Sequence, residues 1–331
     1  MTFRRCATVL LALLVAIVGL TAPAYAEPTD SEGASDKLRK ALEVATRGYV
    51  QANAKYEGSK KRQAELATEL AKLEQQQQKK TAAVQNIAAA AYQTGRIGHF
   101  TALLSAESPD QFIERAIALN NVAITETDAL HELAVARART DSAKADIDAE
   151  VAVEKQQREV MAARKKQAED ALKEAGYGQS TTGPTTWVKT AKPAPRNPDG
   201  SWPDEGCTVN DPTTDGCITA RTLHALQQAK AAGFTRYVSC HRSGGSGEHP
   251  KGQACDFSAA KSGFQNVAAT GGDKTYGTNL AAFFIHNASR LAVMYVIWYQ
   301  KIWLPGSGWR TYGGCCTPAA RHTNHVHVSI Y

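Results

Sequence analysis

The chain has 331 residues, seven cysteines and a formal net charge of +6. This charge is modest, and the chain has neither a basic patch with interleaved aromatic residues nor zinc-finger spacing, so we expect no nucleic-acid partner. Every cysteine except Cys6 lies after residue 200, which indicates that the N-terminal and C-terminal parts of the chain differ in composition.

Residues 1–26 have the features of a secretory signal peptide. Two arginines precede an apolar run over residues 7–20, and Ala-Tyr-Ala at 24–26 supplies small residues for cleavage. No second long apolar stretch follows, so we expect a secreted, extracytoplasmic protein associated with the cell wall. Without the two arginines the net charge is +4, which suits anionic wall polymers. A retained membrane anchor is the alternative.

Residues 34 to about 94 are predicted to form one long helix with a coiled-coil seam. From Leu38 onward the seam positions alternate steps of four and three. Polar residues weaken it at four of these positions, which are Ser59, Gln63, Gln77 and Lys80.

A second helix is predicted from Ser108 to about residue 175. Ser108 is the expected N-cap, with Pro109 at the first helical position and Gln111 completing a capping box. Gly95 marks the expected end of the first helix. Two helices of similar length predict an antiparallel hairpin within residues 27–175, with arms roughly 90 Å long. A parallel dimer is the rival arrangement.

The segment that joins the helices, residues 95–105, is unusually apolar for a hairpin tip. Together with Ser-Pro-Asp-Gln-Phe at 108–112, it resembles the coiled-coil domains of PcsB-, CwlO- and RipC-type division hydrolases. The resemblance implies docking onto an FtsX-like membrane protein and restraint of a wall hydrolase, with Phe100, Leu103 and Leu104 binding the partner. The alternative is a short helix that packs back on the hairpin. Those relatives usually end in an NlpC-type cysteine peptidase, so this chain differs in its effector.

Residues 176–203 are rich in glycine, threonine, proline and lysine and show no period, which predicts a linker. Residues 204–331 then form a compact domain. Its expected helices cover 219–232 and 278–287, and its expected strands cover 236–240, 293–303 and 325–331.

The six cysteines of this domain form an even set in an exported chain, which indicates disulfides. The best local pair is Cys207 with Cys217, and the cysteines at 240 and 255 could pair across strands. The adjacent Cys315 and Cys316 are expected to take separate partners rather than each other.

A candidate zinc site combines His249, Asp256 and the closing run Asn-His-Val-His at 324–327. In an extended strand His325 and His327 share one face. Imidazoles and one carboxylate suit a catalytic zinc that keeps one position open for water. We therefore expect His249, Asp256 and His327 to bind zinc, although these ligands accept other divalent ions too. The alternative is a set of unrelated surface histidines.

The pattern His-x-x-Gly-x-Ala-x-Asp followed by a late histidine resembles the VanY-type D-alanyl-D-alanine carboxypeptidases and the wider lysostaphin and hedgehog zinc group. The resemblance implies that Arg242 helps hold the substrate and stabilises developing charge. The serine usually two residues before the first histidine is replaced by Gly247, with Ser246 one position further back.

A second departure from that family falls at Asn324, where it has an acidic general base. An amide cannot take a proton from water. His325 and His322 are the available substitutes for proton transfer, and we assign Ser246 and Asn324 to substrate binding.

These features predict a long α-helical coiled-coil hairpin followed by a small α+β zinc-peptidase-like domain with an antiparallel sheet. The expected function is hydrolysis of peptidoglycan peptides, as an endopeptidase or carboxypeptidase in wall remodelling or division. The alternative, favoured by Asn324, is a non-catalytic module that binds the wall or regulates a hydrolase. A mechanical scaffold is a third possibility.

Overall fold

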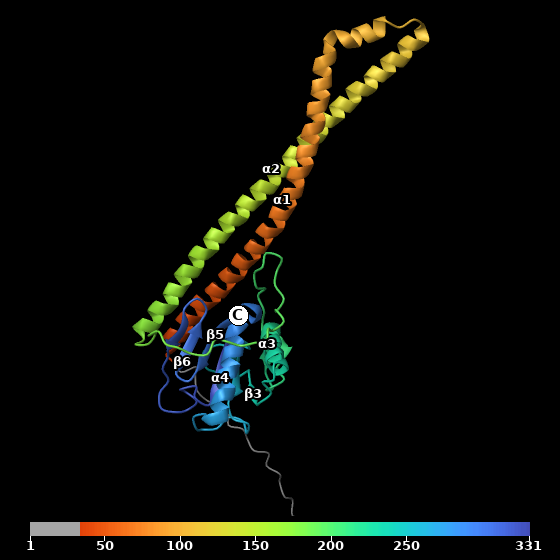
Figure 1. Cartoon of the computed structure of the whole chain (residues 1–331). Helices are drawn as coiled ribbons and strands as arrows, with labels where there is room; N and C mark the ends of the chain where they lie inside the picture. The colour runs from red at the N-terminus through yellow and green to blue at the C-terminus, as the bar shows by residue number, and fades with distance from the viewer. Residues whose placement is uncertain (1–33) are drawn as a thin grey trace, which may run out of the picture.

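A computed structural model of the chain describes residues 34–331, so the predicted signal peptide lies outside the described residues. Helices α1 (Asp36–Leu104) and α2 (Pro109–Glu174) form a hairpin that projects well beyond a small C-terminal domain (Figure 1). Within residues 34–331, no helix is both long and apolar enough to cross a membrane.

The hairpin is antiparallel, as predicted. Ion pairs join Lys37 to Glu174 at its base and Arg62 to Glu150 farther along. Both helices begin at serine caps: the Ser108 hydroxyl accepts from the backbone N–H of Gln111 at 3.2 Å, as the sequence predicted.

Three of the four polar seam positions form bonds between the helices. The Ser59 hydroxyl donates to the Glu150 carbonyl at 2.7 Å, and Gln63 donates to Glu154 at 3.1 Å. Lys80 pairs with Glu132. Hydrogen bonds and ion pairs thus replace apolar contacts where the seam is weak, and they fix the register of α1 against α2.

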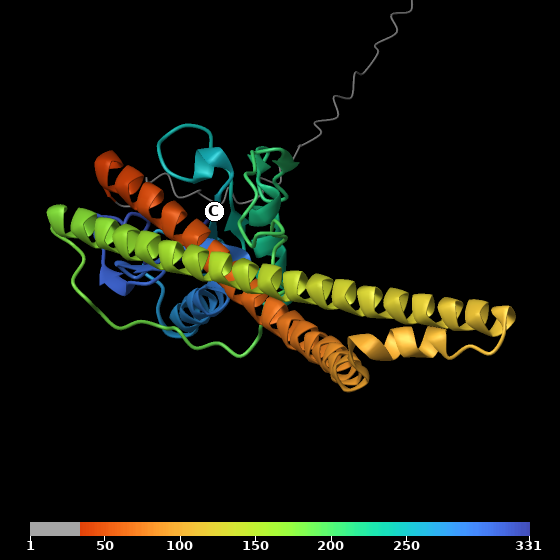
Figure 2. The same ribbon diagram turned by 90° about the horizontal axis from the view of Figure 1, so that it is seen from above.

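The tip differs from the prediction that the first helix ends at Gly95. The chain bends there, at φ 63° and ψ 165°, and then continues as helix to Leu104. Glycine has no Cβ, so it adopts this conformation without a clash while the following residues resume helical geometry. Residues 105–108 alone connect α1 to α2, and the segment after Gly95 bridges the diverging helices at the tip (Figure 2).

The C-terminal domain is built on a six-stranded antiparallel sheet with strand order β3-β4-β8-β5-β6-β7, and β1 and β2 form a separate ribbon. Its strands are β1 (Val209–Asn210), β2 (Cys217–Ile218), β3 (Val238–Ser239), β4 (Ala254–Ser258), β5 (Val293–Trp298), β6 (Lys301–Leu304), β7 (Gly308–Thr311) and β8 (His325–Ile330). Its helices are α3 (Ala220–Ala231), the 3-10 turn η1 (His249–Lys251), α4 (Gly271–His286) and α5 (Ala288–Leu291).

The strand expected over residues 293–303 is instead a hairpin of β5 and β6. Tyr299 and Gln300 form its two-residue turn with φ of 53° and 60°. Glycine and asparagine normally mark such turns, so this sequence gives no local signal for it. Bonds from their backbone N–H groups to the carbonyls of His322 and Arg321 hold the turn in place.

Residues 176–203, predicted to be a linker, run along the surface of the domain. Gly178 donates to the carbonyl of Thr311 in β7, and Ala194 donates to the carbonyl of Arg290 in α5. Trp202 is buried, and its backbone exchanges two hydrogen bonds with the Gln51 side chain on α1. This segment therefore helps to join the hairpin to the domain.

The base of α1 also contacts the loop around η1. Arg47 donates to Gln253 at 2.6 Å and lies 3.4 Å from the buried Glu248 carboxylate. Lys251 pairs with Glu43 at 2.5 Å. Because Glu248 directly precedes His249, these contacts link the hairpin to the segment that carries the first predicted zinc ligand.

Replacing Trp202 with alanine should lower the free energy of unfolding by about 3–5 kcal/mol, because it empties a core position between the hairpin and the domain. Trp202 is 2% exposed, and the Arg196 guanidinium stacks 4.2 Å from its ring. Urea denaturation of the whole mature chain measures this loss. Val188→Ala, at an 88% exposed position in the same 176–203 segment, is the control and should change stability by less than about 0.5 kcal/mol. Equal effects of the two substitutions would contradict the proposed anchoring role.

Candidate metal centre

The neighbouring strands β4 and β8 bring Asp256 and His327 together. Asp256 on β4 lies directly opposite His327 on β8 in the antiparallel register. Directly opposite side chains in such a pair project from the same face of the sheet. The sheet register therefore creates half of the site from residues that are far apart in sequence.

His249 reaches the same place from the turn η1. Gly252 ends this turn with φ 67°, and a Cβ there would lie 2.6 Å from the Cys207 sulfur and from the Ile218 Cα. Only glycine avoids both the backbone strain and the clash. Gly252 thus lets the chain turn from His249 into β4.

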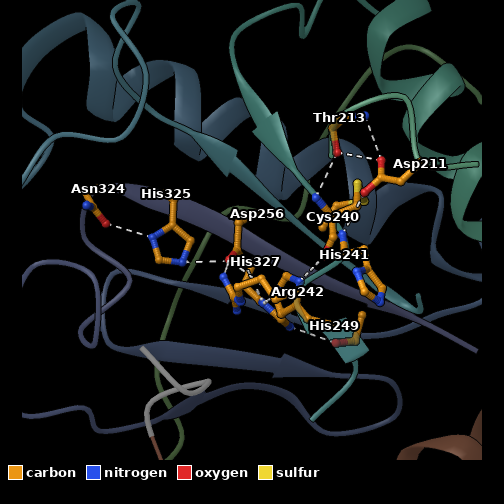
Figure 3. Close-up of polar contacts among 12 residues, drawn as sticks. Asp211, Thr213, Cys240, His241, Arg242, His249, Asp256, Asn324, His325 and His327 are labelled. Carbon is orange, nitrogen blue, oxygen red and sulfur yellow. Dashed lines mark hydrogen bonds and ion pairs between the residues drawn. A yellow bond between two sulfur atoms is a disulfide. The ribbon is translucent and has the colours of Figure 1, made fainter. Parts of the chain in front are cut away.

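The side chains of these three residues converge (Figure 3). His249 Nε2 lies 3.3 Å from one Asp256 oxygen and 3.2 Å from His327 Nδ1, which lies 2.9 Å from the other Asp256 oxygen. Ligand atoms about 2.0–2.1 Å from a tetrahedral zinc stand roughly 3.3 Å apart, so the spacing fits such an ion. All three residues are buried, with at most 2% of each exposed.

Hydrogen bonds on the outer side of each imidazole also favour a metal site. His249 Nδ1 bonds to the Cys240 carbonyl, which can only accept, so Nε2 presents a lone pair to the cluster. His327 Nε2 lies 2.8 Å from the Ser329 hydroxyl, which can accept its proton and leave Nδ1 as the ligand atom. Such outer partners are typical of metal-binding histidines. Neither partner is predictable from a motif, because a backbone carbonyl and a single serine carry no sequence signal.

Asp256 is ionised in this environment. Burial by itself would raise its pKa, but the neighbouring His249 and the Arg242 guanidinium outweigh burial and hold the pKa well below its usual value. Arg242 Nη1 donates to the carboxylate at 2.7 Å. A buried anion beside two lone-pair nitrogens suits a cation, which is the property that a metal ligand set requires.

His325 lies at the edge of this cluster, and Asn324 fixes its ring. The Asn324 side-chain amide donates to the Gln265 carbonyl at 2.6 Å, so its oxygen is left to accept from His325 Nδ1 at 2.8 Å. His325 Nε2 then carries the lone pair, 3.6 Å from Asp256. The predicted substrate contact Asn324 therefore has its amide engaged inside the protein.

His322 joins the same group from the segment before β8. It has φ 49°, and its ring centroid lies 4.7 Å from that of His325. Both predicted proton carriers are thus neighbours in the structure, beside the three predicted ligands.

Two groups of predicted functional residues lie away from the cluster. The Ser246 hydroxyl donates to Asp36 at 2.6 Å, so this predicted substrate residue contacts the base of α1. Phe100 and Leu104 lie at the hairpin tip, 68% and 81% exposed, and Leu103 is half-buried.

Metal-free protein should lose stability as the pH falls from about 6.5 towards 4. Burial lowers the pKa of His325 to about 4 and lowers that of His322 well below its usual value. Both groups titrate near 6.5 when unfolded, so the unfolded chain binds more protons in this window and the stability present above it is lost on acidification. Urea midpoints between pH 7 and pH 4.5 measure the loss. His322→Gln combined with His325→Gln should flatten this part of the profile, and an unchanged slope would contradict the assignment.

Three disulfides form in the domain. The predicted pairs Cys207–Cys217 and Cys240–Cys255 are confirmed. The expectation of separate partners for Cys315 and Cys316 is wrong, because these neighbours pair with each other. With the other four cysteines paired locally, no other partner is left for them in the domain.

Residues 214–323 match the family model described as VldE, C-terminal domain. The match includes His249 and Asp256 and ends just before Asn324 and β8. Searches of curated proteins and of solved structures found no match to the chain. Over residues 214–323, the chain is therefore similar to the VldE C-terminal domain.

Proposed function

We propose that the C-terminal domain is a zinc-dependent peptidase that acts on peptidoglycan peptides. The observation that carries the proposal is the convergence of two imidazole nitrogens and a buried carboxylate at His249, His327 and Asp256, within 4.8 Å of one another. The match to the VldE C-terminal domain, a family associated with VanY-like peptidases, agrees with a peptidase-like domain.

His249, Asp256 and His327 would hold the ion. When bound, zinc supplies Lewis-acid polarisation of the scissile carbonyl and lowers the pKa of water. Arg242 would stabilise the negative charge that develops on that carbonyl oxygen.

His325 would accept the proton of the attacking water through Nε2, since its Nδ1 bonds to Asn324. Asn324 would then be a positioning residue for this ring. His322 would support the transfer from its place beside His325.

The site of action follows from the proposed export. A protein released after residue 26 would act outside the membrane, where peptidoglycan is the available substrate. The exposed Phe100 and Leu104, with Leu103, would bind an FtsX-like membrane protein at the hairpin tip.

The second candidate is a non-catalytic module that binds wall peptides or regulates a hydrolase. Asn324 favours it, because the acidic base of the resembling family is absent. The burial of all three ligand residues also favours it, since a peptide bond must reach the ion to be cleaved.

Metal analysis of the whole mature chain, followed by incubation with purified peptidoglycan, tests the proposal. One zinc per chain together with released peptides is the expected result. Zinc without released peptides would favour the non-catalytic module. Absence of zinc after loading would overturn the metallopeptidase proposal.

A further inference from the structure

A polar pocket of about 570 Å³ borders the candidate metal centre. One part of its lining comes from the loop closed by Cys207–Cys217, and the other comes from the residues after β3. Arg242 belongs to this lining and also bonds to Asp256, so the pocket adjoins the cluster directly. Figure 3 shows Thr213 and Arg242 on either side of Cys240.

The loop side of the pocket is held by the buried carboxylate of Asp211. It accepts from the hydroxyls of Thr213 at 2.7 Å and Thr214 at 2.6 Å. It also accepts from the backbone N–H of His241 at 2.8 Å, which ties the loop to the segment that carries Arg242. This wall is therefore fixed before any ligand binds.

The two threonine hydroxyls of this wall can accept further hydrogen bonds but have no hydrogen left to donate. Each threonine hydroxyl has one hydrogen, and both hydrogens are donated to Asp211. Backbone N–H groups of Cys240 and Gly216 occupy one acceptor position on Thr213 and Thr214 respectively. What each hydroxyl can still offer a ligand is a lone pair.

The charged groups of the lining are also divided between the loop and the segment after β3. Asp215, the next residue of the loop, is exposed and forms no ion pair among the described residues. The lining after β3 carries the Arg242 guanidinium, whose side chain is 18% exposed. Acceptors and a negative charge thus come from the loop, and a positive charge comes from the segment after β3.

We propose that this pocket binds the zwitterionic end of a diamino dicarboxylic acid side chain, a carbon that bears both an ammonium and a carboxylate. The ammonium would bond to Asp215 and the two threonine hydroxyls, and the carboxylate would face Arg242. The proposal rests on the proposed function, because it names the substrate class that the neighbouring metal centre would receive. A lysine side chain would meet only the acidic half.

Binding of three tripeptides to the whole mature chain tests this proposal. They differ only in the third residue: 2,6-diaminoheptanedioic acid, lysine, or 2-aminoheptanedioic acid, which lacks the side-chain ammonium. Calorimetry on zinc-loaded His325→Ala protein prevents turnover. We expect the first peptide to bind about three- to tenfold more tightly than either of the others.

Asp215→Asn should weaken binding of the diamino peptide to the level of 2-aminoheptanedioic acid and leave the affinity of the latter unchanged. Asp128→Asn, an equal charge change at an exposed position on α2, is the control and should change the affinity for neither peptide. Equal affinities for all three peptides, or an equal loss for all of them in Asp215→Asn, would overturn the proposal. Because binding is measured without cleavage, selective binding by a chain that never releases peptides would reject the peptidase but not the pocket.

Discussion

Replacing His327 with alanine should reduce bound zinc from one per chain to nearly none and abolish peptide release. His327 would supply one of three ligand atoms from a buried position on β8 in the sheet. Removal of an outer hydrogen-bond partner of a ligand already costs about 10–100-fold in metal affinity, and loss of a ligand should cost more. Competition with a chromophoric chelator measures the affinity directly.

His131→Ala is a suitable control for this experiment, because His131 is an exposed imidazole on α2, outside the site. It should retain full zinc content. Circular dichroism of both variants separates metal loss from unfolding. If folded His327→Ala protein keeps stoichiometric zinc, this ligand assignment is wrong.

Replacing His325 with alanine should lower kcat by about 10²–10⁴-fold while zinc content stays at one per chain. The reason is positional: His325 Nε2 lies 3.6 Å from Asp256, and His325 is outside the group of three whose ligand atoms converge. Its ring can therefore serve proton transfer without holding the ion. Single-turnover hydrolysis of peptidoglycan fragments measures the effect.

Asn324→Ala provides a second, milder perturbation of the same group. It removes the acceptor at 2.8 Å from Nδ1 and should reduce kcat with little change in KM. Loss of zinc in His325→Ala would reassign His325 as a ligand. Unchanged turnover in His325→Ala would remove it from the mechanism.

Much of the hairpin was predictable because its signals are local. The seam from Leu38 onward, the cap at Ser108 and the proline after it depend on residues within one or two turns of each other. The bend at Gly95 was not predictable in the same way. A glycine near a helix end signals a stop and a kink equally well, and the continuation depends on the residues that follow.

The candidate site was predictable in its membership but not in its chemistry. Spacing within the chain suggested His249, Asp256 and His327 as a set, and the structure brings these three together. Their metal-binding role remains a prediction. The hydrogen bonds that select the imidazole nitrogens come from the Cys240 carbonyl and Ser329. The Ser329 bond follows from the alternation of side chains within β8, whereas the Cys240 bond needs contact between separate segments.

The sequence by itself determined the helical hairpin, the local disulfide Cys207–Cys217 and the residue types available for a metal. These depend on periodicity, short loops and the chemistry of single side chains. The tertiary structure alone decided the β5–β6 turn, the pairing of Cys315 with Cys316 and the contact of α1 with the loop before His249. The turn depends on hydrogen bonds to the segment before β8, and the α1 contact joins segments distant in sequence, so no local pattern encodes either of them. Cys315 and Cys316 are adjacent, and they pair because the other four cysteines of the domain already pair locally.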